Sequence, residues 1–130
     1  MIRISLLYFL AAISVGAVML VSKAVVLEIS FSTLLQVHIE LALFGWLIQF
    51  VLGTAYWMLP RYLKGPKRGS NSLAWGMVAL LNGGLWIYLC AHLEILPDSG
   101  FLAGRVLELI SVGLFIYLHW NRIVAYRRGH

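Results

Sequence analysis

Four long apolar runs occupy most of this 130-residue chain and constrain its fold more than any other feature. They predict helices at residues 4–27, 34–60, 73–96 and 101–124. Each run reaches the roughly 17–25 mostly apolar residues that a helix needs to cross a bilayer. Because the bilayer core offers no water to bond backbone N–H and C=O groups, we expect all four runs to be helical.

The composition supports a membrane protein with almost no soluble part. Hydrophobic residues make up 62% of the chain and charged residues 12%, whereas soluble domains are about 45–50% apolar and about 25% charged. We therefore predict an all-α fold, an integral membrane four-helix bundle formed by residues 1–130 as a single domain. The first run has no clear small-x-small cleavage site after it, so we interpret it as a retained helix rather than a signal peptide.

The distribution of basic residues predicts the orientation. With four spans, the N-terminus, the second connection and the C-terminus share one side, which holds eight of the ten basic residues and none of the five acidic ones. An excess of Lys and Arg marks the cytoplasmic side. Both termini are therefore predicted to be cytoplasmic, in a multi-pass protein of the inner membrane. The same pattern favours the lipid bilayer, and not nucleic acid, as the partner of the positive charge.

Ionisable residues gather in the predicted outer third of the bundle. At a rise of 1.5 Å per residue, His38, His92 and Arg105 are expected at a similar depth of roughly 6 Å below the outer surface. Two histidines at one depth could hold a metal or a haem iron, and Arg105 could bind an acid group such as a haem propionate. Alternatively, each histidine only bonds a neighbouring helix, and Arg105 pairs with Glu108 three residues further on.

A face of the second run combines small and polar residues at steps of three and four. Its members are His38, Ala42, Gly45, Gln49, Gly53, Tyr56 and Pro60. Small residues on one face let another helix, or a flat ring, approach the backbone closely. Glu40 lies two positions from His38, so we expect it on a different face, toward a partner subunit or a metal.

Residues 37–61 resemble the second helix of the catalytic subunits of haem-copper oxidases and nitric oxide reductases. The shared elements are His38, Phe44-Gly45, Gly53, Tyr56 and Pro60-Arg61. In that family the histidine of this helix ligates a low-spin haem near the outer membrane face, so the resemblance implies that His38 is an axial haem ligand. The helices that carry the family's copper site have no counterpart here, and a complete oxidase is not expected. Glu40 stands where the family often has a second histidine.

These patterns predict a small b-type haem protein that transfers electrons or binds a gas such as nitric oxide or oxygen. The cofactor-binding candidates are His38, His92, Arg105, Gly45 and Tyr56, with the two histidines as iron ligands. A histidine from a second protomer could replace His92, and a homo-oligomer is expected because four short helices enclose a haem poorly. A redox partner protein or a quinone is the expected electron-transfer partner.

Two other hypotheses remain open at this point. One is a non-haem metal site, built from residues of the predicted outer half: His38, Glu40, His92, Glu94 and Glu108. The other is a non-catalytic accessory or assembly subunit of a respiratory complex, in which the polar residues only join helices.

Overall fold

The protein consists of four helical rods, each made of one helix or of several consecutive helical segments. The computed structural model describes residues 1–25, 30–59 and 70–127. The first rod is α1 (Ile2–Val21), and the second is continuous through α2 (Phe31–Glu40), the π-helical segment η1 (Leu41–Ile48) and α3 (Gln49–Met58). The third and fourth are α4 (Asn71–His92) and α5 (Ser99–Arg127). Each contains a stretch long and apolar enough to cross a membrane, so the predicted all-α architecture with four candidate spans is confirmed for the described residues.

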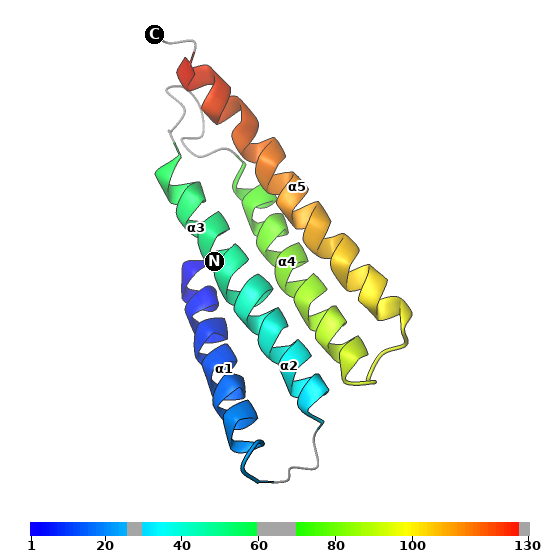
Figure 1. Ribbon diagram of the computed structural model, residues 1–130. Helices are drawn as coiled ribbons and strands as arrows, with labels where there is room; N and C mark the ends of the chain where they lie inside the picture. Colours follow the sequence, from blue (N-terminus) through cyan, green and yellow to red (C-terminus); the bar gives the residue numbers. More distant parts are fainter. Residues whose placement is uncertain (26–29, 60–69, 128–130) are drawn as a thin grey trace.

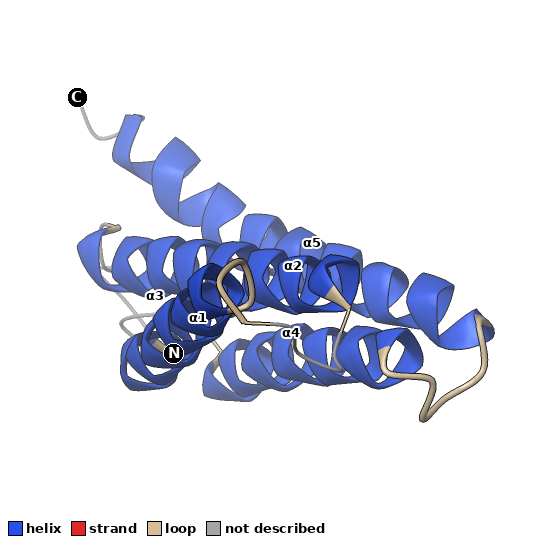
Figure 2. Ribbon diagram, turned by 60° about the horizontal axis from the view of Figure 1, so that its bottom comes forward, coloured by secondary structure: helices blue, strands red, loops and turns tan. Residues whose placement is uncertain are grey.

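The rods alternate in direction and pack side by side. α1 lies along the second rod, α4 follows, and α5 packs along α4 (Figure 1). Figure 2 shows the same bundle after a turn of 60°, with α4 and α5 still adjacent. One end of the bundle contains the first turn of α1, the end of α3 and the last turns of α5 (Figure 1). The turn between α4 and α5 lies at the other end.

Several polar side chains lie inside this bundle, and many large apolar side chains face outward. The buried polar residues are Ser5, Glu40, Gln49, Glu108, Ser111 and His119, each no more than 2% exposed. By contrast, about two-thirds or more of the surface of Leu7, Leu109 and Trp75 is exposed. A soluble protein would expose the charges and bury the apolar groups. The arrangement is that of a protein whose outer surface meets lipid.

Side-chain caps place the starts of two helices a few residues from their predicted positions. The Ser30 hydroxyl accepts the Thr33 N–H at 3.2 Å, so the second rod begins at Phe31 rather than at residue 34. The Ser70 hydroxyl accepts the Leu73 N–H at 3.4 Å, and α4 begins at Asn71 rather than at residue 73. An N-cap oxygen satisfies backbone donors that have no partner within the helix.

The end of α4 departs further from the prediction. The helix stops at His92, four residues before the expected end, because Glu94 adopts the left-handed conformation with φ of 59°. The Glu94 N–H then donates to the Ala91 carbonyl and the Ile95 N–H to the Cys90 carbonyl, the bonding of a Schellman motif. Glycine usually occupies this position. Because a glutamate stands there instead, nothing in the sequence indicated that the helix ends at His92.

The outer bounds of the remaining helices differ less. α1 ends at Val21, residues 22–25 form turns, and residues 26–27 of the predicted first helix lie outside the described residues. Residue 60 of the predicted second helix also lies outside them. α5 begins at Ser99 and continues to Arg127, two residues before and three residues beyond the predicted limits.

The closest helix crossing joins α4 and α5 at two glycines. A Cβ added to Gly84 would lie 2.7 Å from the Gly104 carbonyl oxygen, and one added to Gly104 would lie 2.8 Å from the Gly84 oxygen. Neither distance leaves room for a side chain. Small residues at such crossings allow the backbones to pack closely where lipid gives no hydrophobic drive for association.

Replacing Gly84 with alanine is therefore expected to destabilise the bundle, by about 1–3 kcal/mol for an overpacked contact. The neighbouring Gly83 is the matched control, because a Cβ there meets nothing within 4 Å. Gly83→Ala should be neutral or stabilising by up to about 1 kcal/mol, since alanine favours the helix. Unfolding of both variants in detergent, followed by circular dichroism, measures the difference. Equal stability of the two variants would contradict the close crossing.

Candidate functional site

His38 is held against α1 by a hydrogen bond to the main chain. Its Nδ1 lies 2.9 Å from the Ala12 carbonyl oxygen, an acceptor, so Nδ1 is the protonated nitrogen. The ring also rests on Gly16, where an added Cβ would lie 3.1 Å from the ring carbon Cε1. A carbonyl that binds one ring nitrogen fixes the tautomer and leaves Nε2 as the nitrogen with a lone pair, the arrangement common to metal-binding histidines.

A cavity of about 460 Å³ adjoins this ring. Its lining comes from α1, the turn that follows α1, and α2: Ile13, Gly16, Ala17, Met19, Leu20, Lys23, Phe31 and His38. The volume falls within the range of about 300–1,000 Å³ that is typical of small-molecule and cofactor sites. The lining is mostly apolar, with His38 and Met19 as its possible iron ligands and Lys23 as its cation.

A second, larger cavity of about 660 Å³ lies where α1 begins, between α3 and α4. Tyr56, Trp57, Trp75 and Arg3 are among its lining residues. None of the described lining residues is a histidine, cysteine or carboxylate, so it offers less for metal or proton chemistry than the cavity at His38.

The small-residue face of the second rod packs against α1. Gly45 lies under Tyr8, since a Cβ at Gly45 would be 2.7 Å from the Tyr8 ring carbon Cγ. The Tyr8 hydroxyl donates to Asn82 Oδ1 at 2.8 Å and accepts from Trp86 Nε1 at 3.0 Å, which joins α1 to α4. This face was predicted to admit either another helix or a flat ring. The contact of Gly45 with Tyr8 is a close approach by another helix, α1.

Arg105, itself half-buried, lies at the centre of an ionic cluster with two buried carboxyl groups, which the sequence predicted only in part. Its guanidinium donates to both oxygens of Glu40, at 2.9 and 2.7 Å, and to Oε2 of Glu108 at 2.7 Å. The pairing with Glu108 was one of the two predicted alternatives. The pairing with Glu40 was not predicted, and it replaces the expected contact of Glu40 with a partner subunit or a metal.

Aromatic rings enclose the same guanidinium. Its central carbon lies 4.5 Å from the ring centre of Phe44 and 3.9 Å from that of Tyr88. A cation is attracted to the face of such rings. Three helices therefore meet at Arg105: its own α5, the second rod through Glu40 and Phe44, and α4 through Tyr88. Three of the five guanidinium N–H donors bond the two carboxyl groups inside the chain. The expected contact of Arg105 with a haem propionate stays a prediction.

His92 lies at the end of α4 and faces the start of α5. Its ring centre is 6.3 Å from that of Phe101, which also packs edge-on against Tyr88 at 5.4 Å. The Nε2 atom of His92 is buried, with no hydrogen-bond partner among the described residues. His38 contacts α1 whereas His92 contacts α5. His92 is not part of the cavity lining at His38.

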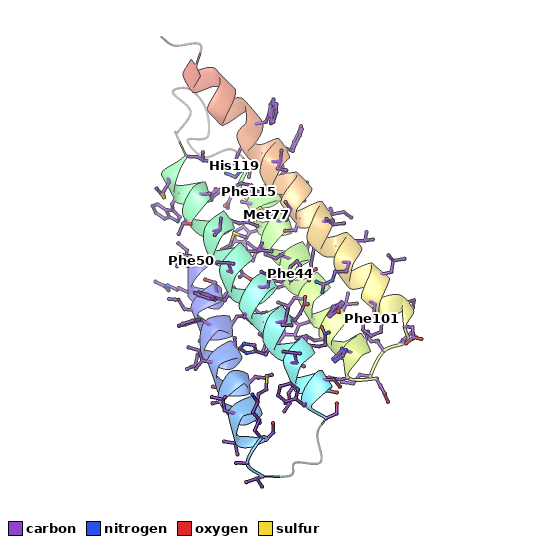
Figure 3. All side chains as sticks on the ribbon, viewed as in Figure 1. Phe44, Phe50, Met77, Phe101, Phe115 and His119 are labelled. Carbon is purple, nitrogen blue, oxygen red and sulfur yellow. The ribbon has the colours of Figure 1, made fainter. Side chains whose placement is uncertain are left out.

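Tyr56 and His119 meet near the other end of the bundle. Their ring centres are 5.5 Å apart in an edge-on arrangement, and His119 Nδ1 lies 2.8 Å from the Phe115 carbonyl oxygen. Figure 3 shows His119 and Phe115 together on α5, far from Phe101 at its beginning. Tyr56 therefore belongs to a different part of the bundle from Arg105 and His92, although all three were predicted as cofactor-binding residues.

Comparisons of the chain with protein-family models, with curated proteins and with solved structures found no match. The resemblance of residues 37–61 to haem-copper oxidases thus stays a prediction. Within the described residues, no group of three or more His, Cys, Asp or Glu side chains is placed to hold a metal ion. The described residues therefore contain no cluster that supports the non-haem metal hypothesis.

Arg105→Lys should destabilise the protein by about 1–3 kcal/mol, because a single ammonium cannot reproduce the planar fork that bonds two carboxylates. Arg3→Lys is the matched control, since Arg3 is exposed. Unfolding of both variants in detergent, monitored by circular dichroism, gives the two free energies. A loss no larger for Arg105→Lys than for Arg3→Lys would contradict the assigned bonding.

Proposed function

We propose that this chain is a small membrane haem protein in which His38 ligates the iron of a haem b. The observation that carries the proposal is the position of His38: its Nδ1 is fixed by the Ala12 carbonyl, and its ring borders a mostly apolar cavity. Neutral imidazole with one nitrogen hydrogen-bonded to a carbonyl is the usual form of an iron-binding histidine. The resemblance of residues 37–61 to the haem-binding helix of haem-copper oxidases supports the same residue.

The cavity lining supports a haem in three further ways. Gly16 lets the His38 ring lie close to α1, and the small side chain of Ala17 leaves space beside it for a flat ring. Lys23, just beyond the end of α1, offers a cation to a propionate, a role first expected of Arg105. Met19 offers a thioether, and histidine with methionine is one of the pairs that hold haem iron in electron-transfer proteins. A haem held in this way supplies one-electron chemistry or a site for a gas.

The orientation and the membrane are part of the same proposal. Eight of the ten basic residues belong to the N-terminal segment, the segment between α3 and α4 and the C-terminal segment of the sequence. We place the end of the bundle with the first turn of α1 and the end of α3 in the cytoplasm, in agreement with the usual excess of Lys and Arg there. The cavity at His38 then lies toward the outer face of an inner membrane. Because the cavity is open at the surface of the bundle, a second copy of the chain is the proposed cover.

The test of the haem proposal is the reduced-minus-oxidised absorption spectrum of the purified protein. His38→Gln is the informative variant, because a glutamine amide can still donate to the Ala12 carbonyl but does not replace imidazole as an iron ligand. We expect this variant to fold and to lose the haem bands. His130→Ala, which changes a histidine outside the described residues, should keep them. A wild-type protein without haem bands, purified after expression with ample haem supply, would overturn the proposal.

The same spectra identify the second iron ligand. Met19 lines the cavity and His92 does not, so Met19→Ala should lose the low-spin signature while His92→Ala keeps it. The opposite pattern would favour the pair of histidines predicted from their matched depth. Such a pair would require an arrangement of helices, or of two chains, other than the one described here.

An accessory or assembly subunit is the second candidate function. It is favoured by the internal bonding of the polar groups, since Arg105, Glu40 and Glu108 bond one another and Tyr8 bonds Asn82 within one chain. On this account His38→Gln would leave both assembly and cofactor content unchanged. The spectra of wild type and His38→Gln therefore separate the two functions.

A further inference from the structure

The ionic cluster at Arg105 contains more negative than positive charge. One guanidinium faces two carboxyl groups, and these are among the most buried side chains of the protein, with Glu40 1% and Glu108 2% exposed. If both carboxyl groups were ionised, the cluster would carry a net charge of −1 in an apolar interior. An uncompensated charge there is strongly unfavourable, and ionisable groups neutralise instead.

The hydrogen bonds indicate which oxygen lacks a counter-charge. Both oxygens of Glu40 accept from Arg105, and so does Oε2 of Glu108. Oε1 of Glu108 is buried and has no hydrogen-bond partner among the described residues. Glu40 therefore has the surroundings of a carboxylate, whereas Glu108 has one oxygen that nothing in its surroundings stabilises as an anion.

Within the described part of the chain, the helices packed around Glu108 bring no second positive charge. From α4 its neighbours are Gly84, where an added Cβ would lie 2.9 Å from Glu108 Cγ, and Tyr88, which stacks on the Arg105 guanidinium. From the second rod, Glu40 and Phe44 face the cluster. Arg105 is the only cation found among these described contacts, so the missing charge has to come from a bound species.

We propose that this cluster is a proton-binding site, with one exchangeable proton held by the Glu108 carboxyl group. A proton suits the site better than a metal cation, because Glu108 Oε1 is the single carboxylate oxygen left over and hard cations require six or more oxygen ligands. Arg105 lies six residues, roughly 9 Å, from the start of α5, and its side chain is 35% exposed. The cluster is therefore close to the end of the bundle, where water can exchange its proton. The cluster then alternates between a neutral state, with Glu108 protonated, and a state of charge −1.

The charge balance predicts that the two glutamates depend on each other. If Glu40 is replaced by glutamine, Arg105 has one remaining carboxyl partner, and Glu108 ionises to balance it. If Glu108 is replaced by glutamine, Glu40 already balances Arg105 and no proton is needed. Either substitution therefore removes the proton from the site, although each leaves one glutamate in place.

Infrared spectroscopy of the purified wild-type protein in lipid at neutral pH tests the proposal. A protonated carboxyl group has a carbonyl stretching band that carboxylates lack, and this band shifts when H₂O is replaced by D₂O. We expect one such band, with the D₂O shift, in the wild type. Absence of the band, or its replacement by a dependence of stability on sodium ions, would overturn the proposal. This measurement needs no variant and no haem, so its result is separate from that of the haem spectra.

The variants test the charge balance itself. Glu40→Gln and Glu108→Gln should each lose the band, while Glu94→Gln, at an exposed glutamate, should keep it. Circular dichroism and size-exclusion chromatography verify that each variant is folded. A band that persists in folded Glu40→Gln would overturn the shared charge balance, and one that persists in folded Glu108→Gln would overturn the assignment to Glu108. If Glu108→Gln fails to fold, Glu108→Asp replaces it: retention of the band at a shifted frequency supports Glu108 as its source, and an unshifted band or the absence of a band overturns that assignment. If Glu40→Gln fails to fold, the band of the wild-type protein and the Glu108 variants still test the proton site.

Discussion

The ion pair between Glu40 and Arg105 is the constraint on which the arrangement of this bundle depends. It joins the second rod to α5 through two hydrogen bonds, in surroundings where a lone charge would be costly. Successive residues of a helix turn by about 100° each, so His38, two positions before Glu40, points about 200° away from it. With Glu40 turned toward α5, His38 is turned toward α1, where it bonds to Ala12. The ion pair thus decides which helix the candidate haem ligand faces.

Glycines make this arrangement possible at each helix contact. Gly16 receives the His38 ring, Gly45 receives the Tyr8 ring, and the pair Gly84 and Gly104 lets α4 close over the Glu108 side chain. In a bilayer, close packing and hydrogen bonds replace the hydrophobic drive that holds soluble bundles together. The glycines and the polar contacts therefore depend on each other, because the small residues leave the space that the hydrogen-bonded side chains occupy.

Much of the fold was predictable from the sequence because the bilayer imposes length and apolarity on each span. The four spans and the all-α class follow from that constraint alone. Helix ends were predicted less well, since Ser30 and Ser70 extend two helices backward and Glu94 ends α4 in a conformation that usually requires glycine. The π-helical turns of η1 were not predicted, because the apolar residues 41–48 show no local feature that distinguishes a π-helix from an α-helix.

Most contacts of the candidate site could not be predicted from the sequence. The depths of His38, His92 and Arg105 were estimated from predicted helix ends. With the observed ends, His92 is the last residue of α4, whereas His38 and Arg105 lie seven and six residues inside their helices. The direction of each side chain depends on which helices are neighbours, and one sequence does not determine that. The pairing of Arg105 with Glu108 was accessible because the two lie on one helix, three residues apart. The pairing with Glu40 spans 65 residues of sequence and required knowledge of the packing.

The most direct test of this account is a double-mutant cycle of Glu40→Gln and Arg105→Gln, measured by unfolding in detergent. Residues that interact give a coupling free energy of about 0.5–3 kcal/mol, whereas distant residues add. We predict that the double variant loses less stability than the sum of the two single variants, because the loss of one partner already removes the interaction. Additive losses would mean that Glu40 and Arg105 do not pair, and they would contradict the central constraint of the bundle.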